Sequence, residues 1–349
     1  MPATHPLRIA VVGAGAFGRN HLRVYRELER AGQPVQIAAI IDSDPLAAAR
    51  AATDFEAPSY PTVAAALAAQ SFEAASICVP TKHHAAAAET LLAASIDLLI
   101  EKPLAATLPE ADRILALAAQ HGRIVQPGHL ERFNPAVTAA RQHLNRPMFF
   151  EAHRLSVFTP RSLDVDVVLD LMIHDLDIVL SLVDSPVHEV RAVGLPVLSR
   201  KVDIANVRLE FASGSIANFT ASRVSTERVR KLRFFQPRQY LSLDFARQDL
   251  LIIDAPDLGS LDPASVAALI AAQNRAPDPA SHPSAGLGLR KIAITPGEPL
   301  RLEIEAFLES IRTRTTPQVT AQGGRDALAL ALDINQAIAE HTKRTGLDG

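Results

Sequence analysis

The beginning of the chain places an apolar segment, a glycine-rich turn and a helix-forming segment directly after one another. Residues 7–12 read Leu-Arg-Ile-Ala-Val-Val, and a helical pattern runs over 19–31. Between them, Gly13 permits a tight turn, Gly15 lets a ligand come close to the backbone, and Gly18 lets helix and strand pack closely. Free N–H groups at the helix N-terminus favour a phosphate, so this order of elements predicts a Rossmann-type unit that binds a dinucleotide. The residues expected to hold it are Gly13, Ala14, Gly15, Ala16, Phe17 and Gly18.

A second apolar segment, residues 35–41, ends in an acidic side chain, Asp42. In a dinucleotide-binding fold an acid at this place accepts hydrogen bonds from the 2′- and 3′-hydroxyls of the adenosine ribose and repels a 2′-phosphate. No Lys or Arg lies within 43–46, so the sequence favours NAD over NADP, although Ser43 leaves NADP open as an alternative. An acidic helix cap would need only Asp44. Asp42 and Ser43 are therefore expected at the cofactor.

Composition places the chain among ordinary soluble globular proteins. Of its 349 residues 48% are hydrophobic and 21% charged, which is enough chain for two separate cores. The formal net charge of -3 supplies no reason to expect nucleic acid as a partner. Cys78 is the only cysteine, which excludes an intramolecular disulfide and a cysteine-only metal cluster and fits a reducing compartment. With no recognisable signal peptide and no apolar stretch long enough to cross a bilayer, a cytoplasmic protein without a membrane partner is expected.

Residues 1–126 alternate short apolar segments with alanine-rich helical segments. This alternation predicts an α/β domain, a doubly wound parallel sheet covered on both faces. The expected strands are 7–12, 35–41, 74–79, 96–100 and 123–126, and the expected helices are 19–31, 45–53, 62–69, 83–94 and 108–121. A ligand binds at the carboxyl ends of such strands. The residues expected there, besides the turn and Asp42, are Pro80, Thr81, Glu101 and Lys102.

Beyond residue 127 the pattern changes to closely spaced strands. The expected strands are 149–158, 187–197, 202–211, 215–223, 228–235 and 239–245. They predict an α+β domain over 127–349 with an open, mostly antiparallel sheet. Residues 254–300 are expected to form a long surface excursion with one short helix near 265–272, and helices 300–312 and 324–341 close the chain. An open sheet with one uncovered face usually needs a partner, so a homodimer or homotetramer is expected.

Lys102 is the first candidate for catalysis. It ends an apolar strand on the expected ligand edge, between Glu101 and Pro103, and the proline stops further strand pairing. A lysine at this place can reach both the cofactor ribose and a substrate hydroxyl. An ordinary surface lysine at a strand end is an equally good interpretation of the position alone.

A second group of candidates lies within residues 166–181. Read as a helix, this segment puts its polar side chains on one line, and these are Asp166, Asp170, His174, Asp177 and Ser181. Such a thin line among aliphatic neighbours predicts a mostly buried helix that offers a narrow polar edge to a pocket, and the alternative is a solvated helix face. A metal site is not expected, because Asp175 lies about 100° around the helix from His174 and no second histidine follows at i+4.

The motifs occur in one order along the chain. After the glycine turn come Pro80-Thr81-Lys82-His83-His84, Glu101-Lys102-Pro103, the segment 128–135, and Asp170 with His174. Together they resemble the glucose–fructose oxidoreductase, inositol dehydrogenase and rhizopine-catabolism (Gfo/Idh/MocA) family over nearly the whole chain. One local departure is Ser95, where many relatives have a glycine, and this affects only a turn.

The resemblance implies site residues beyond those at the strand ends. It makes Lys102, Asp170 and His174 the catalytic residues and places His84 at the cofactor. Residues 128–135 match the family's segment that crosses from the cofactor domain into the substrate domain. The residues of this segment expected at the substrate are His129, Glu131 and Arg132.

The chemistry that the resemblance implies is the oxidation of a secondary alcohol. A histidine side chain, with an ordinary pKa of about 6.5, suits His174 to take the hydroxyl proton while hydride leaves the same carbon for C4 of the nicotinamide. Asp170 would hold the imidazole in one tautomer and stabilise its charged form. Lys102 would hydrogen-bond the hydroxyl and stabilise the developing alkoxide.

The segment 223–233 concentrates positive charge in a chain that is otherwise slightly acidic. In a strand, alternation sends Arg228 and Arg230 to one face and Lys231 and Arg233 to the other. The plainer interpretation is a solvated sheet face whose edge is protected by charge. The sharper interpretation is a site for an anionic group, such as the diphosphate of a sugar nucleotide.

Residues 164–175 and the sequence Ala221-Ser222-Arg223 also resemble the branch of UDP-N-acetylglucosamine 3-dehydrogenases, which supply lipid A precursors. This resemblance implies oxidation at C3 of UDP-N-acetylglucosamine, with Arg223 at the substrate. Inositols and free aldoses are the alternative substrates, and a non-catalytic nucleotide-sensing regulator of the same fold is the alternative function. The presence of the complete catalytic trio argues against the regulator.

Overall fold

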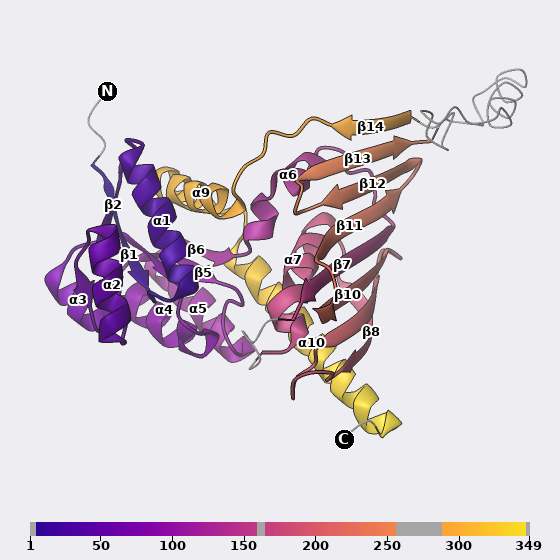
Figure 1. Cartoon of the computed structure of the whole chain (residues 1–349), viewed down its shortest axis with the longest axis horizontal. Helices are drawn as coiled ribbons and strands as arrows, with labels where there is room; N and C mark the ends of the chain where they lie inside the picture. The colour runs from indigo at the N-terminus through magenta and orange to yellow at the C-terminus, as the bar shows by residue number, and fades with distance from the viewer. Residues whose placement is uncertain (1–4, 159–164, 256–287, 347–349) are drawn as a thin grey trace, which may run out of the picture. The chain divides into compact units, whose positions relative to one another are not determined.

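The computed structural model describes residues 5–158, 165–255 and 288–346, and the chain through them is coloured by residue number in Figure 1. The chain divides into two compact units. The first comprises Met1–Phe133 and Gly297–Leu332, and the second comprises Asn134–Pro296 and Asp333–Gly349. The division expected after residue 126 did not include this return of the chain to the first unit.

The first unit is built on a six-stranded parallel sheet with the strand order β3-β2-β1-β4-β5-β6. The strands are β1 (Leu7–Val12), β2 (Val35–Ile41), β3 (Ser59–Tyr60), β4 (Ala74–Ile77), β5 (Asp97–Glu101) and β6 (Val125–Gly128). The helices between them are α1 (Ala16–Arg30), α2 (Pro45–Phe55), α3 (Val63–Ala69), α4 (His84–Ala93) and α5 (Leu108–His121), with 3-10 turns η1 (Thr81–His83) and η2 (Leu130–Phe133). This topology confirms the predicted Rossmann fold, and β1 lies at its switch point between β2 and β4.

A helix from near the end of the chain completes the core of the first unit. This helix, α9 (Pro299–Thr313), contributes Ile304 and Phe307 to a cluster that also contains Leu22, Tyr25 and Leu28 of α1, and all five side chains are fully buried. Burying an apolar side chain of this size stabilises a fold by about 1.5–3 kcal/mol. The helix expected over 300–312 therefore belongs to the first unit.

The second unit is built on an eight-stranded sheet with the order β14-β13-β12-β11-β7-β10-β9-β8. Its strands are β7 (Phe149–Val157), β8 (Val187–Leu195), β9 (Ile204–Phe211), β10 (Ile216–Ser225), β11 (Val229–Gln236), β12 (Gln239–Asp244), β13 (Asp249–Asp254) and β14 (Gly288–Ile292). All neighbouring strands pair antiparallel except β7 and β10, which confirms the predicted mostly antiparallel sheet. Its helices are α6 (Pro135–Arg141), the π-helical turn η3 (Val168–Met172), α7 (Ile173–Leu182) and the end of α10 (Ala321–Thr345). In the described part of the chain, no helix is both long and apolar enough to span a membrane.

Two strands at one edge of this sheet were not predicted. β13 pairs with β12, and β14 pairs with β13, with Leu250 opposite Ile292 and Ile253 opposite Leu289. The expectation of a surface excursion over 254–300 was therefore wrong for β14, whose five residues lie within a stretch rich in Pro, Ala and Ser. Only the pairing with β13 makes this short segment a strand. The helix expected near 265–272 lies outside the described residues.

Candidate active site

The turn after β1 leaves no room for a side chain at two of its glycines. Gly13 has a φ of +98°, and a Cβ there would lie 2.8 Å from the carbonyl carbon of Cys78. A Cβ on Gly18 would lie 1.7 Å from the carbonyl oxygen of Gly13, because α1 packs directly against the turn. At Gly15, the N-cap of α1, an added Cβ would meet no atom within 4 Å. The open side of the turn is therefore at the helix N-terminus, where a pyrophosphate needs it.

Asp42 follows β2 and is joined to the glycine turn. Its Oδ2 accepts a hydrogen bond of 2.6 Å from the backbone N–H of Ala14, and its Oδ1 accepts one of 2.9 Å from Asp44. The N-cap of α2 is Asp44, whose side chain accepts from the N–H of Leu46 at 2.9 Å. Asp44, and not Asp42, therefore caps the helix. The Asp42 carboxylate instead lies beside the glycine turn, where it accepts a hydrogen bond from Ala14.

A pocket of about 610 Å³ opens beside this turn in the first unit. The predicted cofactor residues that line it are Gly13, Gly15, Asp42, Ser43 and Pro80. Other lining residues, which were not among the expected cofactor residues, include Pro61, Thr62, Val63, Cys78, Val79, His83, Ala86, Ala87 and Thr90. Three of these follow β3, so the rule that ligands bind at strand ends would have found them had this two-residue strand been recognised. The concave pocket, the open helix N-terminus and the carboxylate together fit a dinucleotide.

The remaining predicted cofactor residues of this region lie around the pocket. Ala14 is buried, while Ala16 and Phe17 are exposed at the start of α1. Thr81 is half-buried in η1, directly after Pro80. Burial raises the pKa of the Cys78 thiol well above its ordinary value, so this thiol stays uncharged near neutral pH.

Lys102 directly follows β5 and is half-buried. Its neighbour Glu101, the last residue of the strand, is turned inward, with Oε1 2.8 Å from Nε2 of His21 on α1. His21 and Glu101 are both buried. A Cβ on Gly128 of β6 would lie 2.9 Å from the Cα of Glu101, so the adjacent strand approaches closely. The Glu101 carboxylate, one residue before Lys102, therefore contacts a buried side chain of the fold.

The His84 ring connects two segments of the same edge. It is 1% exposed, and its Nε2 lies 2.8 Å from the carbonyl oxygen of Val79 and its Nδ1 3.0 Å from that of Pro103. Burial lowers the pKa of His84, and hydrogen bonds to these backbone carbonyls oppose the shift. The ring therefore ties the segment after β4 to the segment after Lys102, and almost none of its surface is left for a ligand.

The three residues expected at the substrate near β6 are also mostly covered. His129, Glu131 and Arg132 are 1%, 4% and 9% exposed. Arg132 Nη2 donates to the carbonyl oxygen of Gln318 at 3.3 Å, and Gln318 Nε2 donates to that of Arg132 at 3.2 Å. This segment is thus packed within the first unit against chain that precedes α10.

The segment predicted as one regular helix over 166–181 contains a π-turn. Residues Val168–Met172 form this turn, and α7 follows from Ile173. A π-turn uses i→i+5 hydrogen bonds and accommodates one more residue than an α-turn, so side chains before and after it no longer follow one helical line. Asp170 lies inside the π-turn, and His174 lies at the start of α7; both are half-buried. Hydrophobic periodicity cannot detect a single inserted residue, which is why the prediction missed it.

Side chains of this polar line form hydrogen bonds within the second unit. Asp166 Oδ1 accepts from the N–H groups of Val168 and Leu169 at 2.9 and 3.0 Å. Ser181 donates to the carbonyl oxygen of Ile178 at 2.6 Å and accepts from Arg141 at 2.5 Å. None of the five residues of the line is fully exposed, and Asp177 is only 2% exposed. The partial burial of these residues favours the interpretation as a mostly buried helix over that of a solvated face.

Asp175, next to His174, has a structural partner. Its two carboxylate oxygens accept from Nε and Nη2 of Arg154 on β7, both at 2.8 Å, and both side chains are buried. The guanidinium also lies over the ring of Phe245, 5.2 Å from its centroid. This bidentate pair holds the first turn of α7 against the sheet.

The basic residues of the segment 223–233 do not form one cluster. Arg223 lies on β10 and is 5% exposed, whereas Arg230, Lys231 and Arg233 lie on β11, and β7 separates the two strands. Arg228 precedes β11 and is exposed. The turn between the strands places the two ends of the segment on opposite sides of β7, so its basic residues do not share one strand.

Comparisons with known proteins agree with these features. Residues 7–129 match the model of an oxidoreductase family with an NAD-binding Rossmann fold, and residues 136–237 match the GFO/IDH/MocA C-terminal domain. The chain is similar to the UDP-N-acetylglucosamine 3-dehydrogenase of Acidithiobacillus ferrooxidans, with 33% identity over 339 residues, 97% of this chain and 99% of that protein. A solved structure of that enzyme matches with a TM-score of 0.82 at 32% identity, over 95% of this chain and 97% of the other.

A second similarity is shorter. The inositol 2-dehydrogenase of Acidothermus cellulolyticus is 30% identical over 201 residues, which is 55% of this chain and 58% of that protein. The WlbA dehydrogenase from Bordetella pertussis, solved with NADH and UDP-GlcNAcA, shares the fold with a TM-score of 0.74 at 14% identity, over 97% of this chain and 98% of the other.

Proposed function

The chain belongs to the Gfo/Idh/MocA family of NAD-binding oxidoreductases, and we propose that its substrate is UDP-N-acetylglucosamine, oxidised at C3 to the 3-keto sugar. The observation that carries this proposal is the similarity to a UDP-N-acetylglucosamine 3-dehydrogenase at 33% identity across 97% of the chain. The match to an inositol 2-dehydrogenase covers only 55% of the chain. The longer match favours the nucleotide sugar over an inositol.

The first unit supplies the cofactor site of the proposed enzyme. The N–H groups at the start of α1 would hold the pyrophosphate, and Asp42 would accept from the hydroxyls of the adenosine ribose. Ser43, Pro80 and Thr81 would complete its surroundings. When bound, the nicotinamide ring supplies the hydride acceptor. The buried Glu101 and His84 contribute in this proposal by holding Lys102 and Pro80 in place.

The catalytic roles follow from the chemistry of a secondary alcohol. His174 would accept the proton of the sugar hydroxyl, because an imidazole titrates near neutral pH. Asp170 would orient that imidazole and stabilise its protonated form. Lys102 would donate a hydrogen bond to the same oxygen and stabilise negative charge as the C–H bond breaks. Three further residues of the first unit would support the substrate side of the site from beneath its surface. They are mostly buried and would offer the substrate little exposed surface: His129, Glu131 and Arg132.

A substrate panel tests the proposed reaction. Purified protein is mixed with NAD and with UDP-N-acetylglucosamine, UDP-glucose, glucose or myo-inositol, and NADH formation is followed by absorbance. Mass spectrometry then identifies the product. We expect turnover of UDP-N-acetylglucosamine and a product two hydrogens lighter. Turnover of myo-inositol or glucose without any turnover of UDP-sugars would contradict the proposal and favour the alternative substrates.

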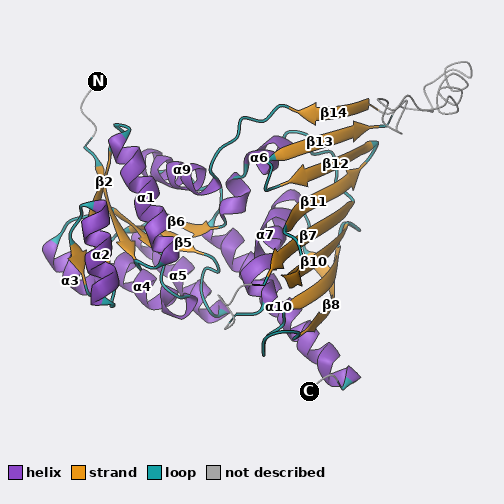
Figure 2. Cartoon of the chain, in the orientation of Figure 1, coloured by secondary structure: helices purple, strands orange, loops and turns teal. Residues whose placement is uncertain are grey.

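We also propose that the enzyme is a cytoplasmic homodimer or homotetramer that uses the open face of its second-unit sheet. Helices lie over one face of this sheet (Figure 2). Apolar side chains on the other face lie in one row of cross-strand partners: Leu289, Ile253, Tyr240, Phe235, Phe149 and Ile216. Phe235 contacts Phe149 and Tyr240, with ring centroids 5.6 and 4.9 Å apart, yet remains 39% exposed. Sedimentation velocity measures the oligomeric state. Phe235→Lys should weaken the assembly, because it places a charge in the apolar row. An unsubstituted chain that sediments as a monomer would contradict the proposed assembly.

A further inference from the structure

We propose that Arg223 is a positioning residue for the catalytic helix, acting through the carbonyl of Val165 and the carboxylate of Asp203. This inference rests on the proposed function, because it takes Asp170 and His174 as the residues that act on the substrate. It changes the role expected for Arg223 from substrate binding to the support of the segment that enters the helix.

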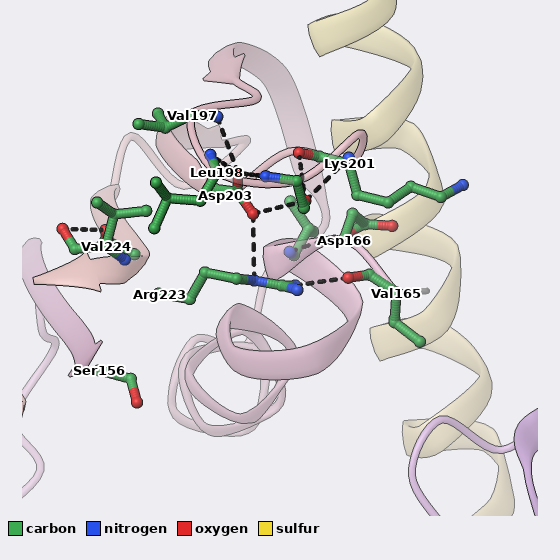
Figure 3. A network of polar contacts seen from close by, with 12 residues as sticks. Ser156, Val165, Asp166, Val197, Leu198, Lys201, Asp203, Arg223 and Val224 are labelled. Carbon is green, nitrogen blue, oxygen red and sulfur yellow. Dashed lines mark hydrogen bonds and ion pairs between the residues drawn. The ribbon is translucent and has the colours of Figure 1, made fainter. Parts of the chain in front are cut away.

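Arg223 lies inside a network of polar contacts (Figure 3). Its Nη2 donates to the carbonyl oxygen of Val165 at 2.5 Å, and its Nε lies 3.7 Å from Oδ1 of Asp203. Its backbone N–H donates to the carbonyl oxygen of Asp203 at 2.9 Å. The Arg223 side chain is 7% exposed and that of Asp203 is 0% exposed. The guanidinium is therefore directed into the protein and joins two segments that are far apart in the sequence.

Asp203 is itself held by a compact loop. Its Oδ2 accepts three backbone N–H groups, from Val197, Leu198 and Ser199, at 2.8, 2.7 and 2.8 Å. Its Oδ1 accepts from the Ser199 hydroxyl at 2.7 Å. Burial alone would raise the pKa of Asp203, but the hydrogen bonds from Ser199, Val197 and Leu198 lower it to about 2. The carboxylate is thus ionised and fixed, and it offers a rigid charged partner to Arg223.

The segment that Arg223 holds leads directly into the π-turn. Val165 precedes Asp166, whose Oδ1 accepts from two N–H groups of the first helical turn and whose Oδ2 accepts from Asn335 of α10 at 3.1 Å. The N–H of Val167 donates to the carbonyl oxygen of Val202, the residue before Asp203, at 2.9 Å. The entry to the helix is therefore bound through Val165 and Val167 to the Asp203 loop and its Arg223 partner, and through Asp166 to α10.

This location matters because of the π-turn. Asp170 lies only a few residues after Val165, within a turn that departs from α-helical geometry. The direction of a side chain in such a turn depends on where the turn begins, so a shift at Val165 moves Asp170 and, through it, the orientation of His174. A catalytic group misplaced by about 1 Å can lose about 100-fold in rate. Arg223 therefore acts on catalysis without touching the substrate.

The test compares Arg223→Gln and Arg223→Lys with a matched control in the first unit. The control is Arg314→Gln, because Arg314 also joins a buried aspartate and a backbone carbonyl, with Nη1 2.6 Å from Asp97 and Nη2 2.8 Å from the carbonyl oxygen of Gly122. We expect Arg223→Gln to lower kcat about 10- to 100-fold with KM for NAD and UDP-N-acetylglucosamine within about three-fold. Arg223→Lys should recover kcat only in part, since an ammonium lacks the fork of donors. Arg314→Gln should keep kcat.

The outcome that would overturn the proposal is a rise in KM for the UDP-sugar at unchanged kcat, which identifies direct substrate binding. A second measurement needs no substrate: backbone hydrogen exchange over residues 167–174 should be faster in Arg223→Gln than in the unsubstituted chain and in Arg314→Gln. Unchanged exchange there would also contradict the proposal. If the unsubstituted protein turned over no UDP-sugar, the proposed function would fail, while the exchange result would still decide the role of Arg223.

Discussion

The two segments that carry the predicted catalytic residues are held by different kinds of contact. In the first unit, Lys102 follows a strand whose last residue, Glu101, pairs with Gly128 of β6 and is bound to the buried His21. The segment after Lys102 is tied through a backbone carbonyl to His84. In the second unit, the helix with Asp170 and His174 begins beside charged groups, and its entry depends on Asp166, Asp203 and Arg223.

This difference teaches where each geometry comes from. The end of a parallel strand is fixed largely by backbone hydrogen bonds that any sequence of suitable pattern can form. A π-turn is not favoured by backbone geometry alone, and longer-range contacts must hold it. In this chain those contacts include the ion pair between Arg223 and Asp203, so the second region should be sensitive to the loss of either charge.

The largest expected effect tests whether both segments take part in catalysis at all. His174→Ala and Lys102→Met should each lower kcat by about two to four orders of magnitude, because a general base or an alkoxide-stabilising group is lost. NAD affinity, measured by fluorescence titration, should stay within several-fold. Asp170→Asn should be milder or comparable, since the histidine remains.

Exposed residues of the same types serve as controls. His188 and Lys343 are both exposed, and their substitution by Ala and Met should leave kcat near that of the unsubstituted enzyme. Near-normal turnover in His174→Ala would show that the base lies elsewhere, and the comparison between two catalytic segments would no longer hold.

A smaller effect tests whether Asp42 sets the preference of the first unit for NAD over NADP. Asp42→Ser should weaken NAD binding relative to NADP by about 10- to 100-fold, because hydrogen bonds to a charged carboxylate are lost and repulsion of a 2′-phosphate is removed. Asp44→Ser is the matched control, since serine is also a good N-cap and the cofactor preference should not change. Titration of both cofactors by fluorescence measures this. Equal or tighter binding of NADP by the unsubstituted protein would refute the argument from Asp42.

The smallest effect concerns stability and pH in the second unit. The folded-state pKa of Asp203, about 2, lies below the ordinary value of 3.8, so this carboxylate contributes about 2 kcal/mol to the stability of the unit above pH 4. That contribution is lost as the pH falls from about 4 towards 2, because the unfolded chain then binds a proton more readily. Asp203→Asn should lose it at neutral pH and flatten the acid side of the stability profile, measured by urea unfolding. The control is Asp184→Asn at an exposed position, which should change neither the stability nor the acid side of the profile. An unchanged acid profile in Asp203→Asn would contradict the stabilising role of the Asp203 carboxylate.

Much of the first unit could be predicted from local patterns. The strand boundaries Leu7–Val12 and Val35–Ile41 and helix Leu108–His121 are those expected, because alternating apolar runs and turn residues specify them. Asp42, Ser43 and Pro80 line the predicted pocket for the same reason, since strand ends meet at one edge of a parallel sheet.

The parts that could not be predicted depend on contacts between distant residues. Arg223 and Asp203 approach each other only because β9 and β10 are neighbours, and nothing in their local sequences indicates that partnership. The inward direction of Glu101 likewise depends on His21, eighty positions earlier in the chain. β14 became a strand only through pairing with β13. The spacing of residues along one segment cannot predict partners that lie far away in the sequence.

The contribution of α9 to the core of the first unit has a consequence for the order of events during synthesis. Leu300, Ile304 and Phe307 share that core with Leu22 and Tyr25 of α1. A ribosome releases α1 early and α9 only after all of the second-unit sheet has been translated. The nascent chain therefore carries an incomplete first core through the synthesis of residues 134–296, with the part of the apolar surface of α1 that α9 covers still exposed. The dinucleotide-binding half of the protein, although encoded first, is the half that is finished by a late helix.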